Sequence, residues 1–521
     1  MEGLPLESLN SVGNCPTLVC TPILGTTVAQ MLIQMRRANE IGADMVEIRL
    51  DYLRTFNPTP HLQTLISQSP LPTIVTYRPT WEGGKYEGDE TKRQDVLRLA
   101  MELGADYIDV ELQVADDFNR SICEKKPHNF KVIVSSHNFH NTPSAEAIGN
   151  LVARIQATGC DIAKIVTTAS DITDCAHIFQ IMIPTIGIVM GERGLISRLL
   201  SPKFGGYLTY GALEEDAISA PGQITVKNML ELYNFRLIKA DTKVYGIIGK
   251  PVGHSKSPLL FNAAFKSVGL NSVYMHFLVD DVEKFFNTYS SPDFASGCSC
   301  TIPHKEVALK CMDEVDPIAK KIGAINNIVR RPDGKLIAFN TDYIGAITAI
   351  EDGLRGLDGA VPVVGSPLSG KMFVVLGAGG AGKSLAYGAA QKGARVVVAN
   401  RTFERAKELA EKVGGKAMTL SEVESFHPEE GMVLANTTSV GMKPNIDQTP
   451  IPKHALVHYC LVFDAIYTPK DTKLLRDAKE TGAAIVYGTE MLIRQGFEQY
   501  KNFTALPAPE DLFRQLMEKH A

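Results

Sequence analysis

Six ionisable side chains that could together form a reactive site lie near four short apolar segments in the first half of the chain. They are, in chain order, Glu47, Arg49, Arg78, Glu82, His137 and Lys164. Lys164 lies among Ile162, Ile165 and Val166, and burial there would disfavour the charged ammonium and lower the pKa of the amine. A neutral amine can attack a ketone to form a Schiff base, and His137 could then move the proton next to the iminium carbon. These residues therefore predict imine chemistry on a ketone.

Two other interpretations of these side chains stay open. A lysine inside an apolar strand is often only ion-paired, or reaches the surface with its charged end. A histidine at such a position can bind a metal, but no second ligand follows His137 at the spacing of a His or Cys site, so we expect no metal.

A glycine-rich string in the last third of the chain has the pattern of a dinucleotide-binding turn. GAGGAG follows the apolar segment MFVVL and precedes a helix-forming stretch that begins at Lys383, which is the context that a phosphate-binding turn requires. Glycines that serve only a tight turn are the alternative. The predicted cofactor contacts in this string are Gly377, Ala378, Gly379, Gly380, Ala381 and Gly382.

The end of the next apolar segment distinguishes NAD from NADP. There VVVANRT places Asn400, Arg401 and Thr402 where an NAD-binding protein has an acid, and Arg405 follows one turn later. The two arginines offer cations for a 2′-phosphate, so we expect NADP. A pair of arginines that is merely solvated is the alternative.

The elements that would position the first group of residues recur regularly over residues 1–240. Eight short apolar segments rich in β-branched residues begin at positions 17, 45, 73, 107, 131, 161, 184 and 208. Stretches with helical periodicity lie between them. Eight strand–helix units in this length predict a (β/α)8 TIM barrel, whose site lies at the C-terminal ends of the strands.

The rest of the chain predicts two further α/β units. Residues 241–350 predict a compact mixed lobe that binds substrate, and we expect the C-terminal helices at 489–521 to pack back onto it. Residues 371–488 predict a doubly wound, Rossmann-type domain. The expected fold is therefore α/β throughout, with a barrel followed by a two-lobed unit.

Composition limits the class of partner. The 521 residues include 53 Lys and Arg against 58 Asp and Glu, a formal net charge of −5, with 45% hydrophobic and 21% charged residues. This balance has no electrostatic signature of nucleic-acid or membrane binding, so we expect small-molecule partners and a monomer. Nine scattered cysteines favour a reducing compartment. The first residues, MEGLPLESLN, lack the features of a signal or transit peptide, so we expect a cytoplasmic protein, or a plastid one if a leader has been removed.

The first half of the chain resembles the type I 3-dehydroquinate dehydratases. The resemblance rests on the runs MVEIRLD, TYRPTWEGG, SSHNF, DIAKIV, ISRLL and SAPGQ within residues 15–235. It implies that Lys164 forms the imine with substrate, that His137 is the general acid and base, and that Glu82 positions His137. The groups that it implies for binding the substrate's hydroxyls and carboxylate are Glu47, Arg49, Arg78, Arg198, Ser219 and Gln223.

Residues 244–515 resemble the shikimate dehydrogenases through GKPVGHSKSP, SCTIPHKE, GAINN, FNTD, GAGGAG, NRT, TTSVGM and DAIYTP. The resemblance implies that Lys305 and Asp342 form a catalytic pair, in which Lys305 supplies a proton to the developing alkoxide and Asp342 orients it. Taken singly, Lys305 could be a surface lysine and Asp342 a helix N-cap. Gly488 joins the implied cofactor contacts, and the implied substrate contacts are Ser255, Ser257, Thr301, Asn326, Tyr467 and Gln495.

Together the two resemblances identify the chain as a member of the fused enzymes that join both activities, as in plants. Such an enzyme would dehydrate 3-dehydroquinate to 3-dehydroshikimate and then reduce it to shikimate with NADPH. The same barrel fused to a quinate-preferring dehydrogenase is the alternative, since Gly253 and Asn327 depart from the common shikimate pattern. A non-catalytic metabolite sensor is a third interpretation, which the presence of both catalytic pairs disfavours.

Overall fold

The computed structural model describes residues 17–215, 220, 222–357 and 365–520. By their contacts the residues group into two units. The first contains Met1–Lys243, Gly269–Asp280 and Asn287–Tyr289, and the second contains Val244–Val268, Asp281–Phe286 and Ser290–Ala521. Within the described ranges, no helix combines the length and the apolar character that crossing a bilayer requires.

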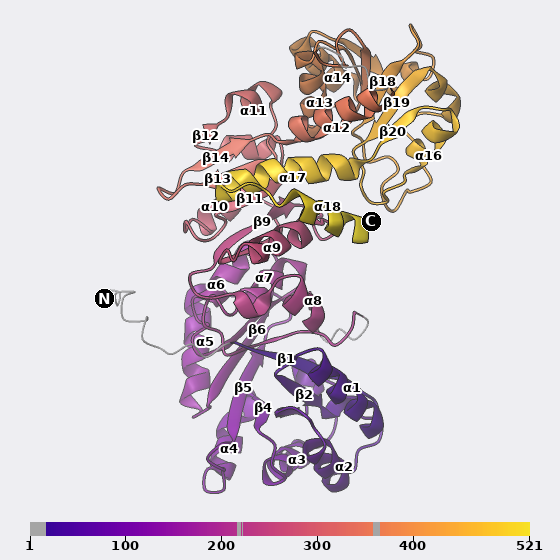
Figure 1. Cartoon of the computed structure of the whole chain (residues 1–521). Coiled ribbons are helices and arrows are strands. Elements are labelled where there is room, and N and C mark those ends of the chain that lie inside the picture. Colours follow the sequence, from indigo (N-terminus) through magenta and orange to yellow (C-terminus); the bar gives the residue numbers. More distant parts are fainter. Residues whose placement is uncertain (1–16, 216–219, 221, 358–364, 521) are drawn as a thin grey trace. The chain divides into compact units, whose positions relative to one another are not determined.

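An eight-stranded parallel sheet forms the centre of the first unit (Figure 1). Its strands run in the order β7-β6-β5-β4-β3-β2-β1-β8. At the seam between β7 and β8, the described residues have a backbone hydrogen bond from Tyr207 N–H to Thr185 O, 3.1 Å, in place of a strand ladder. The predicted barrel is confirmed, with nearly complete closure. The strands are β1 Leu18–Ile23, β2 Met45–Arg49, β3 Thr73–Thr76, β4 Tyr107–Glu111, β5 Lys131–His137, β6 Ile162–Thr168, β7 Ile186–Met190 and β8 Leu208–Tyr210.

Helices follow the strands of this barrel, and several begin at a capping side chain. Thr27, Asp89, Ser144 and Thr225 each accept a hydrogen bond from a backbone N–H in the first turn of the helix that follows, which satisfies a donor that the helix itself leaves free. The helices are α1 Val28–Glu40, α2 Pro58–Ser67, α3 Glu90–Glu102, α4 Leu112–Ile122, α5 Ala145–Ala157, α6 Cys175–Phe179, α7 Leu195–Leu199 and α8 Val226–Glu231.

A mixed six-stranded sheet precedes the glycine-rich turn, in the order β10-β9-β11-β13-β14-β12. β11 pairs parallel with β9 and antiparallel with β13, so the sheet is mixed as the sequence predicts. The two-residue strand β12 escaped the sequence analysis because it is too short to show an alternating pattern. The strands are β9 Lys243–Gly249, β10 Ser272–Leu278, β11 Gly297–Cys300, β12 Glu314–Val315, β13 Asn327–Arg330 and β14 Leu336–Phe339, and the helices are α9 Ser257–Ser267, α10 Val282–Thr288 and α11 Pro317–Ile322.

The Rossmann-type sheet is wholly parallel, in the order β17-β16-β15-β18-β19-β20. Phe373 and Val375 face one apolar core while Val374 and Leu376 face the other, so both faces of the central strand are covered. The strand order reverses between β15 and its neighbours β16 and β18, which places a crevice for ligand outside their carboxyl ends. The strands are β15 Met372–Leu376, β16 Arg395–Asn400, β17 Lys416–Thr419, β18 Met432–Asn436, β19 Tyr459–Asp464 and β20 Ala484–Val486, and the helices are α12 Asp342–Leu357, α13 Gly380–Gln391, α14 Phe403–Val413, α15 Leu420–Val423 and α16 Lys473–Glu480.

The last two helices, α17 Gly488–Thr504 and α18 Glu510–Lys519, return to the substrate lobe (Figure 1). Phe513 of α18 has no exposed surface. Its ring centroid lies 5.7 Å from that of Phe261 on α9 and 6.4 Å from that of Tyr500 on α17. One aromatic side chain therefore joins three helices of the second unit.

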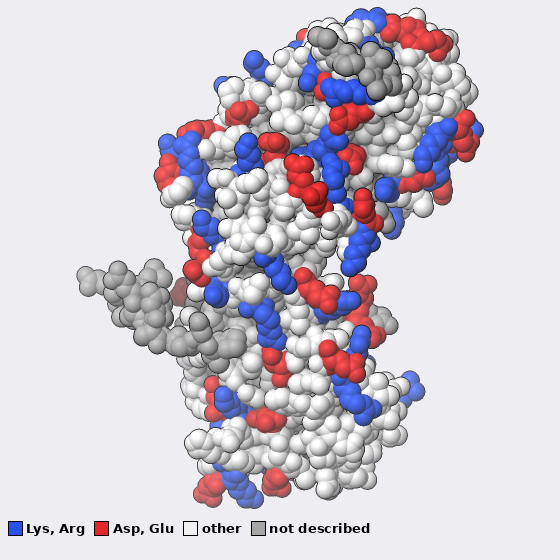
Figure 2. Space-filling model, viewed as in Figure 1, with Lys and Arg blue, Asp and Glu red and all other residues white. Residues whose placement is uncertain are grey.

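Charged side chains of both signs are interspersed over the face of the molecule in Figure 2. That face carries no broad region of a single sign. The small negative net charge is thus not concentrated on the surface in view.

We expect Phe513→Ala to lower the free energy of unfolding of the second unit by about 3–5 kcal/mol, the usual cost of removing a buried phenylalanine ring. Urea unfolding followed by far-UV circular dichroism measures this change. Trp81, the single tryptophan, belongs to the first unit, so its fluorescence reports on the barrel alone. If the fluorescence midpoint falls as much as the dichroism midpoint, the destabilisation is not confined to the aromatic cluster.

Candidate active sites

One layer of side chains inside the barrel is polar. Like the layers of other such barrels, it comes from alternate strands, and each member occupies the third position of its strand. The members are Glu47 on β2, Asp109 on β4, Lys164 on β6 and Tyr210 on β8. Lys164 Nζ lies 2.7 Å from Asp109 Oδ2 and 3.2 Å from the Tyr210 hydroxyl. Glu47 Oε1 is 3.7 Å from the same nitrogen.

Lys164 is buried, and its amine has a charged partner. The nitrogen is ion-paired with Asp109, a carboxylate that is itself fully buried. The apolar residues Ile162 and Val166 lie in the barrel interior two positions away on either side. They separate the pair from neighbouring layers, while Asp109 and Tyr210 supply its polar contacts.

Asp109 was not among the predicted site residues. Burial by itself would raise the pKa of this carboxyl, but the positive charges of Arg78 and Lys164 outweigh burial and lower the pKa below its ordinary value. Asp109 is thus a buried anion held by two cations. Its alternation with Glu111 in the strand YIDVEL is a signal that the sequence analysis could have used, since alternate strand positions share one face.

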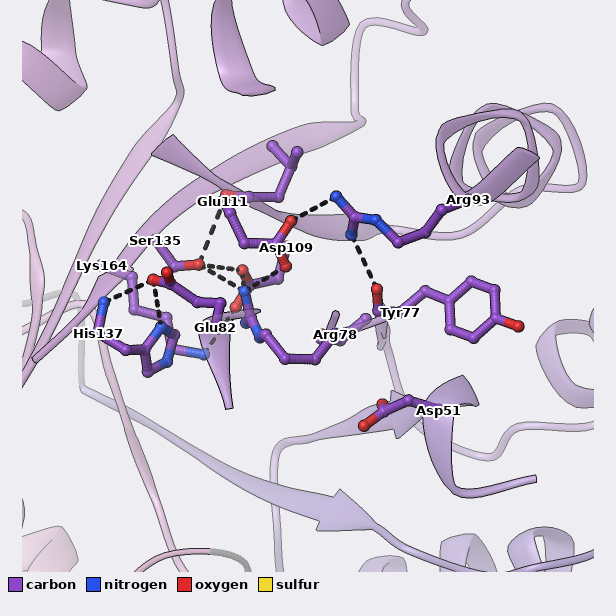
Figure 3. Close-up of polar contacts among 12 residues, drawn as sticks. Asp51, Tyr77, Arg78, Glu82, Arg93, Asp109, Glu111, Ser135, His137 and Lys164 are labelled. Carbon is purple, nitrogen blue, oxygen red and sulfur yellow. Dashed lines mark hydrogen bonds and ion pairs between the residues drawn. The ribbon is translucent and has the colours of Figure 1, made fainter. Parts of the chain in front are cut away.

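Arg78 is surrounded by acceptors (Figure 3). Its Nη2 lies 2.8 Å from Asp109 Oδ1, and its Nη1 lies 2.7 Å from Glu111 Oε1 and 2.9 Å from Ser135 Oγ. The second carboxylate oxygen of Glu111, Oε2, lies 2.7 Å from Arg93 Nη2. Opposite charges therefore alternate from Lys164 through to Arg93.

Arg93 completes this row from helix α3. Its side chain is fully buried, donates to Tyr77 O at 2.8 Å and pairs with Glu90 at 2.7 Å. A buried charge is tolerated when it is paired and hydrogen-bonded, and loss of one partner typically costs about 3–5 kcal/mol. The row thus fixes Arg78 in place and, through it, Asp109. This role for Arg78 is one that sequence reasoning did not reveal.

His137, the last residue of β5, contacts Glu82, which lies in the short 3-10 helix Thr80–Glu82 after β3, as expected. Glu82 Oε1 accepts a hydrogen bond from the backbone N–H of His137 at 2.7 Å and lies 3.2 Å from Nδ1 of its ring. Burial, with the charges of Arg78 and Lys164, lowers the pKa of His137 well below 6.5. A carboxylate at Nδ1 favours the tautomer protonated there, which leaves Nε2 as the base. Burial also raises the pKa of Glu82.

Two predicted arginines differ in their partners. Arg49 pairs with Asp51 through two contacts, at 3.0 and 2.8 Å. Arg198 on α7 is 2% exposed, and its Nη1 donates weakly to Tyr210 O at 3.4 Å. Among the described residues no carboxylate pairs with Arg198, and its Nε has no hydrogen-bond acceptor. Burial lowers the pKa of its guanidinium to about 10.

A buried cation of this kind is suited to an anionic ligand. Gln223, another predicted substrate contact, is buried in the same unit. The predicted contact Ser219 lies outside the described residues.

In the second unit, Lys305 and Asp342 are in contact, with Lys305 Nζ 2.5 Å from Asp342 Oδ2. Asp342 begins helix α12 but does not cap it. Asn340 Oδ1 accepts hydrogen bonds from the backbone N–H groups of Asp342 and Tyr343 instead, at 3.1 and 3.4 Å. The Asp342 carboxylate is therefore available to the lysine, which rules out the simple N-cap interpretation.

Asn326 links this pair to helix α17. Its Nδ2 donates to Asp342 Oδ1 at 2.9 Å and to Gln495 Oε1 at 3.2 Å. Gln499, one turn beyond Gln495, donates to the same Gln495 oxygen at 2.6 Å and is 1% exposed. The sequence analysis missed Gln499, because a glutamine on a helix is common and only the fold places it here.

Three of the remaining predicted substrate contacts lie close to one another. Ser255 donates to Ser257 Oγ at 3.1 Å, and the hydrogen bond between Ser255 and the Tyr467 hydroxyl brings a third predicted residue to the same place. Thr301 follows strand β11, and its backbone N–H donates to Ile248 O at 3.0 Å. The Ser255 group supplies three hydroxyls, a set that can bind a carboxylate or a sugar-like hydroxyl.

The glycine-rich string forms a strand–turn–helix, but the helix begins earlier than predicted. α13 begins at Gly380 rather than at Lys383, so Ala381 and Gly382 belong to its first turn. A Cβ on Gly382 would lie 2.0 Å from Gly377 O, and Gly377 has a φ of +106°, so these two positions require glycine. The close turn leaves backbone N–H groups of the helix start for a phosphate, which fits a dinucleotide.

The groups expected at the ribose are arranged around β16. Asn400 Oδ1 accepts a hydrogen bond from Ala378 N–H at 3.2 Å, and its amide donates to Thr402 O at 2.9 Å. Arg401 is exposed. Arg405 is ion-paired with Glu306 at 2.8 Å, a contact that the sequence did not predict. Gly488 begins α17, where a Cβ would lie 2.6 Å from Ile466 O.

Comparison with protein families matches four segments of the chain. They correspond to type I 3-dehydroquinase over residues 19–240, the shikimate dehydrogenase substrate binding domain over 247–328, shikimate/quinate 5-dehydrogenase over 362–464 and the shikimate 5′-dehydrogenase C-terminal domain over 488–518. A bifunctional 3-dehydroquinate dehydratase/shikimate dehydrogenase from Arabidopsis thaliana, described as chloroplastic, is 63% identical over 97% of this chain and 85% of its own length. The chain belongs to this family.

Two further relatives match only the second half of this chain. A shikimate dehydrogenase (NADP(+)) from Pyrococcus furiosus is 39% identical over 54% of this chain and 97% of its own length. A solved shikimate dehydrogenase in complex with NADP+ is 36% identical over 54% of this chain and 97% of its own, with a TM-score of 0.47. The family membership predicted from the sequence is confirmed by the identity to the Arabidopsis enzyme and by the family models.

We expect His137 to titrate below its ordinary pKa of 6.5 and the pKa to rise in Lys164→Met. The substitution removes a nearby positive charge that opposes protonation of the ring. NMR titration of the histidine 13Cε1 resonances in both proteins measures the shift, with the exposed His128 followed alongside as a control for global change. An unchanged His137 pKa in the variant would show that burial and Arg78 alone hold it low.

Proposed function

We propose that the barrel dehydrates 3-dehydroquinate through an imine on Lys164, and that the second unit reduces 3-dehydroshikimate to shikimate with NADPH through Lys305 and Asp342. Family membership supports both activities. The observation that carries the barrel assignment is a buried lysine amine, ion-paired with Asp109, in a site that also holds the buried guanidinium of Arg198.

In the barrel, the polar layer is suited to a cationic intermediate. The Lys164 ammonium gives up a proton, and its neutral amine attacks the ketone. That proton then leaves with the former ketone oxygen as water, which gives an iminium, and the buried carboxylates of Asp109 and Glu47 stabilise its positive charge. The iminium acidifies the adjacent C–H, from which Nε2 of His137 takes the proton. The resulting imidazolium returns a proton to the departing hydroxyl, so that water leaves. Hydrolysis of the imine releases product and restores Lys164.

Arg198 is the residue that we propose binds the substrate's carboxylate in the barrel site. A cyclic acid brings a carboxylate into the barrel, and Arg198 is a buried arginine for which we find no carboxylate partner within the described ranges. A bidentate arginine–carboxylate contact would orient the ring and place its ketone near Lys164. Arg49 and Gln223 remain proposed contacts to the hydroxyls, and Arg78 acts chiefly by holding Asp109.

In the second unit, Lys305 is proposed as the proton donor. Its ammonium is held by Asp342, which is fixed in turn by Asn326. NADPH, when bound, supplies the hydride to the ring ketone. Lys305 then meets the developing alkoxide with a proton, and Asp342 keeps the ammonium oriented during the transfer. The hydroxyls of Ser255, Ser257 and Tyr467, with Thr301 and Gln495, are proposed to hold the substrate.

Cofactor binding is proposed at the Gly377–Gly382 turn, with Gly488 and the Asn400, Arg401, Thr402 and Arg405 group at the ribose. The turn has the glycines that a close phosphate contact requires. We propose shikimate rather than quinate as the product, in agreement with the Arabidopsis relative. The chloroplastic description of that relative supports a plastid location, and the monomeric state stays a prediction.

We expect borohydride reduction in the presence of 3-dehydroquinate to attach substrate covalently to Lys164, because hydride reduces an imine to a stable amine. Peptide mass spectrometry of wild type, Lys164→Ala and Lys92→Ala, a surface lysine of α3, locates the adduct. Label should appear on wild type and Lys92→Ala alone, while Lys164→Ala keeps its dehydrogenase activity. An adduct on another residue, or none on wild type, would refute the imine on Lys164.

We expect Lys305→Ala to lower kcat for 3-dehydroshikimate reduction by about 10²–10⁴, the usual contribution of a general acid, and to leave dehydratase activity unchanged. Lys310→Ala, an exposed lysine five positions on, serves as the control. In the wild type, kcat/KM for shikimate should exceed that for quinate. A quinate value at or above the shikimate value would favour the quinate-preferring alternative.

A further inference from the structure

Glu306 is a carboxylate that lies between the substrate lobe and the Rossmann domain of the second unit. Its Oε2 lies 2.6 Å from Lys383 Nζ, and its Oε1 lies 2.8 Å from Arg405 Nη2. Lys383 stands in the first turn of α13 and Arg405 in the first turn of α14. One side chain from the turn after β11 therefore bridges the starts of two helices of the dinucleotide-binding domain.

Both helix starts favour an anion. The backbone N–H groups and the helix dipole carry partial positive charge there, and the two cationic side chains add to it. Arg405 is one of the two arginines proposed for the 2′-phosphate of NADP. Glu306 is thus ion-paired with Arg405, a cation that is proposed to bind the cofactor.

Glu306 also directly follows the proposed proton donor. The stem of Lys305 packs against the glycine turn, since a Cβ on Gly380 would lie 2.9 Å from Lys305 Cβ. The Lys305–Glu306 dipeptide therefore contacts the first turn of α13 twice, once through the Lys305 stem and once through the Glu306 carboxylate. Arg405 is thus paired with the residue next to the proposed proton donor.

We propose that Glu306 is an internal substitute for the 2′-phosphate of NADP. In the cofactor-free enzyme it pairs with Arg405 and Lys383, and on NADP binding Arg405 exchanges the carboxylate for the phosphate. The proposal rests on the proposed NADP-binding role of Arg405. Because the competition involves only the 2′-phosphate, Glu306 lowers affinity for NADP without lowering affinity for NAD.

The expected size of the effect follows from exposure. The side chains of Arg405, Glu306 and Lys383 are 50%, 35% and 17% exposed, so water and salt screen the pairs. Removing the competing charge should therefore tighten NADP+ binding by about two- to fivefold, the range typical of partly exposed ion pairs. The gain should shrink as salt concentration rises.

Isothermal titration of the full-length protein with NADP+ and with NAD+ tests the proposal. In Glu306→Gln, we expect the Kd for NADP+ to fall about two- to fivefold and the Kd for NAD+ to stay at the wild-type value. Glu411→Gln, on the same helix as Arg405 and with the same change of charge, should behave as wild type toward both. Circular dichroism and an unchanged thermal unfolding midpoint confirm that each variant is folded.

An unchanged or higher Kd for NADP+ in Glu306→Gln would overturn the proposal. Equal tightening toward NADP+ and NAD+ would also overturn it, because the carboxylate would then oppose a part that both cofactors share. Arg405→Met separates this inference from the function on which it rests. If that variant loses affinity for NADP+ but not for NAD+, the role of Arg405 stands whatever Glu306 does; if it loses neither, the assignment of Arg405 fails.

Discussion

The Lys164 ammonium and the Asp109 carboxylate lie 2.7 Å apart inside the barrel, in a polar layer next to apolar side chains. Neither charge is stable there alone, since an unpaired buried ion loses several kcal/mol of hydration. Each therefore requires a partner, and each partner requires another. Asp109 is held by Arg78, Arg78 by Glu111, and Glu111 by Arg93 from outside the strands. The reactive lysine thus depends on a row of alternating charges that reaches helix α3.

This arrangement also determines which groups remain for a ligand. Arg78 and Arg49 already have carboxylate partners, whereas we find none for Arg198 in the described part of the chain. Burial, together with the same two cations that lower the pKa of Asp109, lowers the pKa of His137 and favours its neutral form. The electrostatics of the barrel therefore leaves one buried cation for an anionic substrate and one neutral base for a proton.

In the second unit, too, neighbouring side chains hold an ion pair in place, but these side chains are amides rather than charged groups. Lys305 and Asp342 form the ion pair, and Asn326 fixes Asp342 while Asn340 takes over the capping of α12. The support for Asn326 comes from α17, more than 150 positions later in the chain, through Gln495. The return of the C-terminal helices to the substrate lobe is what makes this contact possible. The barrel site thus relies on Asp109, Glu111 and Arg93, which lie outside the motifs that carry the chemistry, whereas the second site relies on motif residues that the fold brings together.

Sequence alone determined the local features of this protein: eight barrel strands, the glycine turn, and the lysines, histidine and carboxylates of the two sites. The strands, the turn, Lys164 and His137 follow from periodicity, glycine requirements and side-chain chemistry, which are properties of short segments. Glu82, Lys305 and Asp342 were assigned through the motifs that the chain shares with the two families. Asp109, Glu111, Arg93, Gln499 and the Glu306–Arg405 pair were decided only by the tertiary structure. Each acts by pairing with a side chain distant in the sequence, and a single sequence does not specify which of its many charged and amide groups will meet. The fold brings those partners within hydrogen-bond distance.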